Sequence, residues 1–253
     1  MTEVSIILPT YNSINYIEKA IKSVLDQTFN NWELIIIDDC SKDGTKLLLK
    51  KKYSKFKKIK IIYNKKNLGP GLSRNKGLKY SRGRYIAFLD SDDMWKKNKI
   101  ENQLQVMKKK KYLFTFTQVL YNKKECLKKR LFKLPKKVSY SSLIFHNIIT
   151  TSSVMINNTL LKKNDLSFNK YGYDDYSLWL RVLQKVEYSF LIDRYLTIYN
   201  TNYNLVSKNK FLSLKWIWRI YFIENKLNFF KSLICCIINI ILSLSKKIFY
   251  VKA

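Results

Sequence analysis

The sequence predicts an α/β fold, with a doubly wound, mostly parallel sheet, flanking helices and a C-terminal tail that is basic, apolar and helical. Short apolar runs rich in β-branched residues recur in the N-terminal part, at Val4–Leu8, Leu34–Ile37, Ile59–Tyr63 and Tyr85–Leu89. Segments of helical character separate these runs, which is the order of βαβ units. Two of the runs pass directly into aspartates, and parallel strands place such ends on one shared edge.

The first two strands and the helices after them follow from local patterns. Val4–Leu8 stops at Pro9, which is typical of a short buried parallel strand. Apolar residues within Ile17–Leu25 recur at spacings of three and four, so this segment is expected to be an amphipathic helix. Leu34–Ile37 is the second strand, and Asp43-Gly44-Thr45 turns the chain into a Lys-rich helix.

The later elements are less regular. Ile59–Tyr63 leads into the Gly-Pro-Gly loop at 69–71 and a helix that ends near Gly83, before the fourth strand. Beyond it, further strands are expected at Leu113–Leu120 and Ser153–Ile156. The pattern remains that of a parallel α/β domain with an irregular second half.

The chain divides by pattern into a domain and a tail. Residues 1–205 are expected to form one α/β domain, with a regular half at 1–100 and a looser half at 101–205. Residues 206–253 form the basic, apolar tail. A hydrophobic content of 47% is ample for a packed core.

Charge is distributed unevenly along the sequence. The chain has 48 Lys+Arg and 18 Asp+Glu, a net charge of +30, and its lysine runs read as solvated helix faces. Eight of the eighteen acids nevertheless fall in three short clusters, at 38–43, 90–93 and 174–175. Crowded like charges repel, so a cation or a catalytic task is expected at these clusters.

The cysteines and the start of the chain indicate the compartment. Cys40, Cys126, Cys235 and Cys236 show neither metal-ligand spacing nor a disulfide framework, which favours a reduced, cytosolic setting. Met1-Thr2-Glu3 runs straight into the first strand, so no secretory signal is expected.

The run Asp90-Ser91-Asp92-Asp93 is the most informative segment. It follows an apolar strand and therefore sets carboxylates at the edge where open α/β sheets bind ligands. Oxygen-only ligands suit Mg²⁺ or Mn²⁺, ions that often reach substrates through diphosphate oxygens. The alternative is an Asp-rich turn that caps the next helix.

Five motifs in order resemble glycosyltransferase family 2, the inverting enzymes of the GT-A fold that include bacterial surface-polysaccharide enzymes. They are SIILPTYN at 5–12, IIIDDCSKDGT at 35–45, NLGPGLSRNKG at 67–77, YIAFLDSDDMW at 85–95 and DDYSLWLR at 174–181. The resemblance covers roughly residues 3–205. It implies a nucleotide-binding half at 1–100 and an acceptor half at 101–205.

The resemblance implies a nucleotide pocket at the ends of the first two strands. Pro9, Thr10 and Tyr11 would line it, with Tyr11 near the base, although an aromatic there could also be a packing residue. Asp39 would accept a proton of uracil or another base. Arg74 would face the nucleotide, where its fork of donors suits phosphate or base.

The resemblance also assigns the metal site and the catalytic base. Asp92 would ligate Mn²⁺ or Mg²⁺ directly, Asp90 would face ribose or metal-bound water, and Asp93 would be a second ligand or a helix cap. Asp175 would begin a helix and deprotonate the acceptor hydroxyl as that hydroxyl attacks the anomeric carbon, and direct displacement of the leaving group inverts this carbon. Asp174 stands where the family usually has Glu. Both could also serve as N-cap residues.

The sequence departs from the family after the base helix. An Arg-x-His-like stretch is common there, but this chain has Tyr199-Asn200-Thr201-Asn202, so the positive charge is either missing or supplied by Lys208 or Lys210. The single histidine, His146, would either touch the acceptor or be a partly buried polar residue.

The tail is expected to lie on a membrane surface. Trp216–Val251 reads as helical, and its uninterrupted apolar run between Lys231 and Lys246 is shorter than the roughly 20 residues of a spanning helix. Apolar insertion and attraction to anionic head groups would hold it there. The alternative is a helix that packs on the domain or on a second subunit.

The expected function is sugar transfer from a nucleotide-sugar donor, UDP-linked by expectation, to a glycan or lipid-linked acceptor of a cell-surface polysaccharide. The expected location is the cytoplasm, peripherally on the inner face of the cell membrane. A nucleic-acid-binding protein is the competing class, but it would exclude acids from its cleft. A nucleotidyltransferase would need a Gly-rich basic loop after the first strand, which is absent at 9–12. A non-catalytic scaffold of the same fold stays open.

Overall fold

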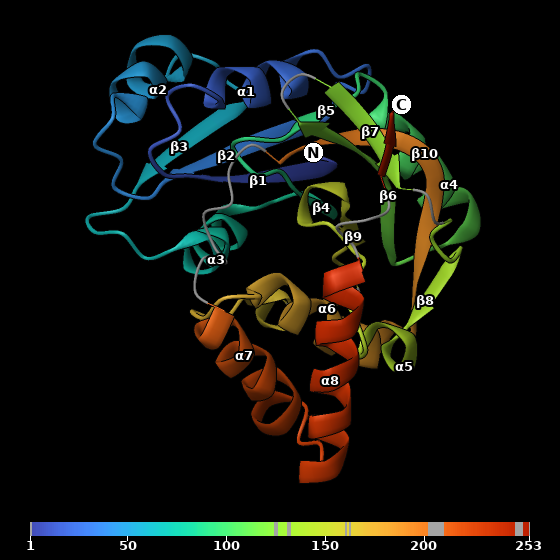
Figure 1. The fold of residues 1–253 in the computed structure, drawn as a ribbon. Helices are drawn as coiled ribbons and strands as arrows, with labels where there is room; N and C mark the ends of the chain where they lie inside the picture. Colours follow the sequence, from blue (N-terminus) through green and yellow to red (C-terminus); the bar gives the residue numbers. More distant parts are fainter. Residues whose placement is uncertain are drawn as a thin grey trace.

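The fold is built around one sheet with helices on both faces (Figure 1). The computed structural model describes residues 2–123, 126–130, 133–159, 161, 163–201, 210–245 and 250–252. The strands are β1 (Val4–Thr10), β2 (Trp32–Asp38), β3 (Ile59–Tyr63), β4 (Tyr85–Phe88), β5 (Met94–Trp95), β6 (Phe114–Lys123), β7 (Cys126–Arg130), β8 (Lys137–Ser139), β9 (Met155–Asn157), β10 (Tyr188–Asn200) and β11 (Tyr250–Lys252). The helices are α1 (Ile17–Leu25), α2 (Thr45–Tyr53), α3 (Pro70–Tyr80), α4 (Lys99–Lys110), α5 (Tyr140–Leu143), η1 (Thr151–Ser153), η2 (Lys163–Leu166), α6 (Asp174–Val186), α7 (Lys210–Arg219), η3 (Ile220–Glu224) and α8 (Phe229–Ser245).

The sheet joins a parallel half to a mixed half, in which β10 pairs in parallel with β6 and antiparallel with β5 and β8. Its main path runs β11-β7-β6-β9-β4-β1-β2-β3. The pairs of β1 with β2 and β4, and of β2 with β3, are parallel, whereas β9 runs antiparallel to both β4 and β6. The four strands expected in the N-terminal part therefore form the parallel half, which confirms the predicted α/β class.

The two faces of the sheet pack against different helices, because successive side chains of a strand point to opposite faces. On one face, Ile6 and Leu8 share a buried cluster with residues of α1, α2 and α4. On the other face, Ile7 shares a cluster with residues of α3, α6 and the tail helices. This arrangement is the doubly wound architecture that the sequence predicts.

The first strand continues further than the sequence suggests. Pro9 was expected to stop it, but Pro9 pairs with Ile37 and the strand ends only at Thr10. The pairing of β1 with β4 stops at Ile7 and Phe88, so Pro9 lies where β1 has a partner on one side only. A residue without a backbone N–H is tolerated in such a position.

The tail differs from the single helix expected over Trp216–Val251. It forms two helices, α7 and α8, joined through η3, and then a short strand, β11, that pairs with β7. Lys226 between them has a positive φ of 50°, and the Asn228 side chain accepts the N–H of Lys231 at the start of α8. A polar turn with its own helix cap therefore interrupts the apolar pattern. The boundary expected at 205/206 lies outside the described residues.

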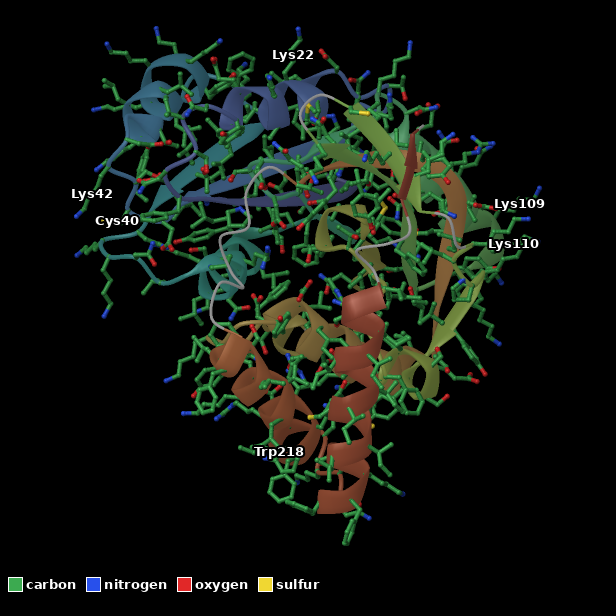
Figure 2. The ribbon with its side chains drawn as sticks, viewed as in Figure 1. Lys22, Cys40, Lys42, Lys109, Lys110 and Trp218 are labelled. Carbon is green, nitrogen blue, oxygen red and sulfur yellow. The ribbon has the colours of Figure 1, made fainter. Side chains whose placement is uncertain are left out.

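The two tail helices, here called the tail hairpin (residues 210–245), pack on the domain. Ile217, Tyr221 and Cys235 belong to the same buried cluster as the core of α6. Among the described residues, no helix has the length and apolar character needed to cross a membrane. In Figure 2, Trp218 lies on the outer side of the hairpin, while Lys109 and Lys110 extend from the far rim of the domain into solvent.

Candidate active site

The acidic clusters of the sequence meet where the parallel strands end. Asp38 closes β2, Asp90 follows β4, and Asp174 and Asp175 begin α6 beneath the same edge of the sheet. The chain brings these residues together because parallel strands share direction and α6 starts at their carboxyl ends.

Arg74 binds two of these clusters at once. Its Nη2 donates to Asp90 Oδ1 at 2.6 Å, and its Nη1 donates to Asp174 Oδ2 at 3.2 Å. Its guanidinium is buried and lies 5.1 Å from the ring centroid of Phe168. Burial works against the charge, but Asp90 and Asp174 outweigh it and raise the pKa of Arg74 above its ordinary value. Arg74 thus organises the acids of the site, and the nucleotide-facing role expected for it stays a prediction.

Gly71 makes room for this contact. A Cβ at Gly71 would lie 2.4 Å from Asp174 Oδ2 and 2.5 Å from the backbone oxygen of Asn169. Burial raises the pKa of Asp174 to about 6, with Arg74 opposing the shift and Asp175 adding to it. The residue that stands in the family's Glu position is therefore tightly confined.

Asp175, the predicted base, lies at the first turn of α6. Its Oδ2 accepts the hydroxyl of Thr151 at 2.9 Å, and its Oδ1 accepts the N–H of Tyr176 at 2.7 Å. Burial raises the pKa of Asp175 above its ordinary value, while Arg74 and the Thr151 hydrogen bond partly offset the shift. A fixed carboxylate with a raised pKa has the properties of a general base.

Asp93 points into the protein. Its Oδ2 accepts the Ser152 hydroxyl at 2.5 Å, and its Oδ1 accepts the N–H of Asn200 at 2.9 Å. Burial, with Asp92 and Asp90 nearby, raises its pKa well above the ordinary value. The ligand or cap role predicted for Asp93 stays a prediction, and the geometry shows it fixing the loop that carries Asp90.

Asp92 and Asp90 are the carboxylates of this loop that reach solvent. Both are partly exposed, and burial with the charge of Asp90 raises the pKa of Asp92 to about 6. Among the described residues, no three His, Cys, Asp or Glu side chains form a metal site. Mg²⁺ in phosphate-transfer sites commonly takes only one or two carboxylates plus substrate phosphates. A crowded pair of hard oxygen donors fits that pattern.

The sheet edge where the nucleotide is expected carries an exposed tyrosine ring, that of Tyr11, and the carboxylate of Asp39. Tyr11 is 46% exposed and therefore open for stacking. Asp39 accepts the N–H groups of Leu68 and Gly69, at 2.9 and 2.8 Å, and so holds the loop before α3. The base-binding role of Asp39 and the pocket-lining roles of Pro9 and Thr10 stay predictions.

Two buried acceptors at this edge are unpaired. Thr10 and Asp38 are register partners of β1 and β2. Among the described residues, neither Thr10 Oγ1 nor Asp38 Oδ1 has a hydrogen-bond partner. Burial raises the pKa of Asp38. Unpaired buried polar atoms are costly, and a buried water molecule is the usual partner of such atoms.

Two pockets flank the acids and share one wall. The first, here the Tyr121 pocket, has a volume of about 380 Å³ and includes Tyr121, His146, Tyr199, Asn239 and Ser243. The second, the Trp216 pocket, has a volume of about 390 Å³ and includes Leu68, Gly71, Arg74, Asp174 and Trp216. Asp90, Thr151, Tyr173 and Asp175 line both. The predicted base therefore faces two cavities of a size typical for small ligands.

The structure describes residues 199–201 of the stretch that departs from the family pattern. Asn200 supports Asp93 through its backbone N–H, and Tyr199 lines the Tyr121 pocket. His146 lines the same pocket, as one of its two expected roles requires. Asn202 and Lys208 lie outside the described residues, as does the side chain of Lys210.

Sequence reasoning missed the segment that supports the acids from behind. Ser152 donates to Asp93, accepts the N–H of Asp90 at 3.0 Å, and offers its backbone oxygen to Trp95 Nε1 at 2.7 Å. Thr151 beside it orients Asp175. The run of four hydroxyl residues at 150–153, before an apolar strand, is the signal that could have identified it.

Comparisons with known proteins identify the family of this chain. The family model described as Glycosyl transferase family 2 matches residues 5–166. The Bacillus subtilis (strain 168) protein named putative teichuronic acid biosynthesis glycosyltransferase TuaG is 35% identical over 92% of each chain. The Escherichia coli protein named UDP-Glc:alpha-D-GlcNAc-diphosphoundecaprenol beta-1,3-glucosyltransferase WfgD is 37% identical over 88% of each chain.

A solved structure supports the fold. S. aureus TarS 1-349 in complex with UDP-GlcNAc matches with a TM-score of 0.74 at 22% identity, over 88% of this chain and 65% of that one. That likeness confirms the GT-A architecture, while the family model and the two sequence relatives confirm the resemblance carried by the five motifs. This chain belongs to glycosyltransferase family 2 and is a glycosyltransferase.

Proposed function

We propose that this protein transfers a sugar, with inversion, from a UDP-linked donor to a lipid-linked glycan during synthesis of a cell-surface polysaccharide. The observation that carries the proposal is the position of Asp175 in the wall between the Trp216 pocket and the Tyr121 pocket. A transfer reaction needs a base between donor sugar and acceptor hydroxyl, and this wall offers one. The name of WfgD includes a UDP-glucose donor and a diphosphoundecaprenol-linked acceptor, and the name of TuaG includes teichuronic acid biosynthesis.

The donor would occupy the edge formed by the parallel strands. Tyr11 would stack on the base, and Asp39 would bind its polar edge. The sugar would enter the Trp216 pocket, next to Arg74. Asp92 and Asp90 would hold Mg²⁺ or Mn²⁺, which neutralises charge on the departing diphosphate when bound.

The chemistry then follows from Asp175. An acceptor hydroxyl in the Tyr121 pocket gives its proton to Asp175 as its oxygen forms a bond to the anomeric carbon. The bond from that carbon to the diphosphate breaks, and the nucleoside diphosphate leaves with the electron pair. Thr151 keeps the carboxylate oriented through this step.

The tail hairpin would place the enzyme at its lipid-linked acceptor. Phe211, Phe230 and Ile241 are 80%, 75% and 58% exposed on its outer side, and the exposed Lys215 and Lys231 flank them. Exposed apolar residues flanked by lysines can insert into a bilayer while the lysines attract its anionic head groups. The cytoplasmic face of the cell membrane is the proposed location, because nucleotide sugars and reduced cysteines belong to that side.

The test is metal-dependent hydrolysis of a panel of nucleotide sugars in the absence of acceptor. The wild-type protein should hydrolyse one donor slowly with Mn²⁺ or Mg²⁺, and chelation or Asp92→Ala should abolish the reaction. Asp26→Ala, at an exposed carboxylate after α1, is the matched control and should retain it. If no donor is bound or hydrolysed with either ion, the non-catalytic scaffold becomes the better interpretation.

A further inference from the structure

Helix α8 turns its small and polar residues toward the domain and its large apolar residues toward solvent, the opposite of an ordinary surface helix. Its inward face carries small or polar residues, and Ser232, Cys235, Cys236 and Asn239 are at most 8% exposed. Its outward face carries the large apolar residues, with Phe230 75% exposed. Surface helices normally turn their apolar stripe to the core. The inward polar row therefore needs an explanation separate from the outward apolar one.

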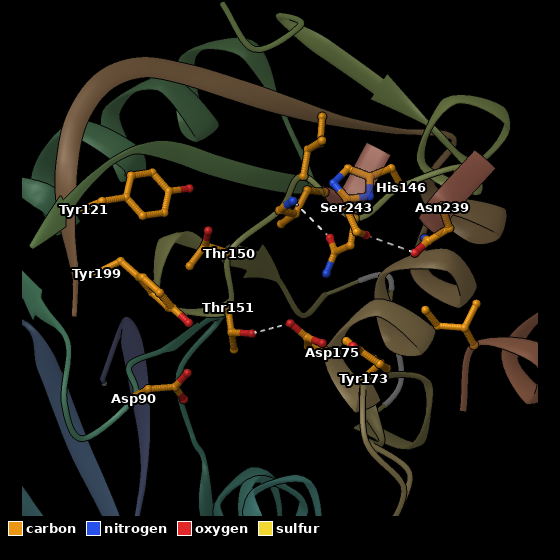
Figure 3. Close-up of a pocket in the computed structure, with 14 residues that line it drawn as sticks. Asp90, Tyr121, His146, Thr150, Thr151, Tyr173, Asp175, Tyr199, Asn239 and Ser243 are labelled. Atoms are coloured by element: carbon orange, nitrogen blue, oxygen red, sulfur yellow. Dashed lines mark hydrogen bonds between the residues drawn. The ribbon is translucent and has the colours of Figure 1, made fainter. Parts of the chain in front are cut away.

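The far end of this polar row forms part of the Tyr121 pocket. Asn239 and Ser243 line that pocket on the side opposite Tyr121 and Tyr199 (Figure 3), and Asp175 lies between them at the shared wall. Residues of β6 and β10 thus enclose the cavity on one side, and residues of the tail hairpin enclose it on the other.

A chain of hydrogen bonds fixes these tail residues relative to the base helix. Ser243 Oγ donates to Asn239 Oδ1 at 3.4 Å, and Asn239 Nδ2 donates to the Tyr221 hydroxyl at 3.2 Å. The Tyr221 and Tyr176 hydroxyls lie 3.0 Å apart, and Tyr176 directly follows Asp175. An amide has two N–H donors and a carbonyl with two lone pairs. Asn239 therefore keeps hydrogen-bonding capacity for a ligand after these contacts.

The lining of the pocket indicates the charge of its ligand. Among the described residues, none that lines this pocket is Lys or Arg, although the Trp216 pocket includes Arg74 and Lys170. Hydroxyls, amides and tyrosine rings predominate instead. Such a surface suits an uncharged sugar ring, with the diphosphate of a lipid carrier outside the pocket.

We infer that α8 supplies the acceptor subsite, in which the Asn239 amide and the Ser243 hydroxyl bind a neutral sugar of the lipid-linked acceptor. The inference rests on the proposed function and adds specificity-determining residues to it. One face of α8 binds the acceptor sugar, while the opposite face contacts the membrane that holds the lipid carrier of this sugar. Sugar recognition and membrane contact are then properties of a single helix.

The experiment measures acceptor kinetics and donor hydrolysis on the same variants. The acceptors are Glc, Gal, GlcNAc and GalNAc, each linked through diphosphate to a short lipid and presented in detergent micelles. Ser243→Ala and Asn239→Ala should each raise the acceptor KM about three- to tenfold, as expected for loss of one neutral hydrogen bond. Donor hydrolysis without acceptor should stay within about twofold of wild type. Ser243→Phe should fill the pocket and abolish transfer.

Ser232→Ala is the matched control, because Ser232 lies on the same inward face of α8 but does not line this pocket. If Ser243→Ala and Asn239→Ala behave like Ser232→Ala while wild type transfers sugar, the inference is wrong and the proposed function stands. Transfer to none of the four acceptors by a protein that hydrolyses donor also overturns the inference. Absence of donor hydrolysis in wild type overturns the proposed function itself.

Discussion

Arg74 Nη1 lies 3.2 Å from Asp174 Oδ2, and this buried ion pair joins two segments that are 100 residues apart in the sequence. Its other terminal nitrogen holds Asp90 at 2.6 Å. The loop after β4 and the start of α6 are thus held in one arrangement by a single side chain. The relative position of the predicted metal carboxylates and the predicted base depends on Arg74.

Replacing Arg74 should destabilise the fold as well as the site. In Arg74→Met two carboxylates lose their buried partner, and removing one member of a buried pair commonly costs about 3–5 kcal/mol. We expect a clear loss in the free energy of unfolding, measured in urea. Lys108→Met, which removes an exposed partner of Glu3, is the control and should change little. Equal effects of the two substitutions would contradict a structural role for Arg74.

Gly71 should tolerate no side chain. In Gly71→Ala the new Cβ would meet Asp174 Oδ2 at 2.4 Å and the Asn169 backbone at 2.5 Å, so Asp174 must move away from Arg74. We expect transfer activity to fall at least about tenfold, since small displacements of a catalytic arrangement are costly. Lys79→Ala on the exposed side of the same helix should keep full activity. Steady-state kinetics on both variants measures the difference.

Asp175→Asn should remove the base without removing the donor site. We expect kcat for transfer to fall about 10²- to 10⁴-fold, the usual contribution of a general base, with the donor KM unchanged. Because the pKa of Asp175 is raised, wild-type activity should decline on acidification at a higher pH than for an ordinary carboxylate. The pH profile of kcat/KM, measured at saturating metal, tests this direction. A flat profile down to pH 4 would contradict the assignment.

The parallel half of the fold was predictable because its signals are local. Each of its strands is a short apolar run, and Ile17–Leu25 has clear helical spacing. Strand β10 escaped prediction for a physical reason. Its pairing with β6 shifts register between Ile192 and Tyr195 and again before Thr197, so no regular alternation is visible in the sequence. Its place in the sheet depends on β6 rather than on its own pattern.

The site was predictable in its acids and not in what surrounds them. Aspartates at the ends of apolar strands can be recognised in the sequence. The contacts of Arg74 with Asp174 and of Ser152 with Asp93 cannot, because they join segments that are far apart in the sequence. No spacing rule connects such pairs. The same is true of Asn239, whose place in the Tyr121 pocket follows from how the tail hairpin folds back. Asn239 and several serines are visible within the apolar run of the sequence, but their position at a pocket is not.

The outer side of the tail hairpin should bind anionic membranes. Ile234→Asp with Ile241→Asp places charges on two exposed apolar positions, 54% and 58% exposed, and should abolish co-flotation with phosphatidylglycerol vesicles. Phe56→Asp, at an aromatic residue 43% exposed after α2, is the control and should float normally. Wild type should bind phosphatidylcholine vesicles more weakly, because its lysines gain nothing there. A concentration-dependent dimer that ignores both vesicles would show that a second copy covers this face.

A buried lysine should make the stability of the protein depend on pH. Lys99 is fully buried, with Nζ 3.4 Å from the backbone oxygen of Val154 and 3.9 Å from the ring centroid of Trp95. Burial lowers the pKa of Lys99 well below its ordinary value of 10.5. Between pH 10.5 and the folded pKa, Lys99 is therefore protonated in the unfolded chain and neutral in the folded chain. Stability falls as the pH drops from 10.5 to the folded pKa and does not fall further below it.

Lys99→Met should remove that dependence, because methionine fills a similar volume without a titrating group. Between pH 9.5 and the folded pKa, the unfolding free energy of Lys99→Met minus that of wild type should increase by about 1.4 kcal/mol for each unit of decreasing pH. Urea unfolding of both proteins at pH 9.5 and pH 7 measures the gain. Lys97→Met, at an exposed neighbour, should show none. A difference between wild type and Lys99→Met that is equal at both pH values would mean that Lys99 stays charged in the folded protein.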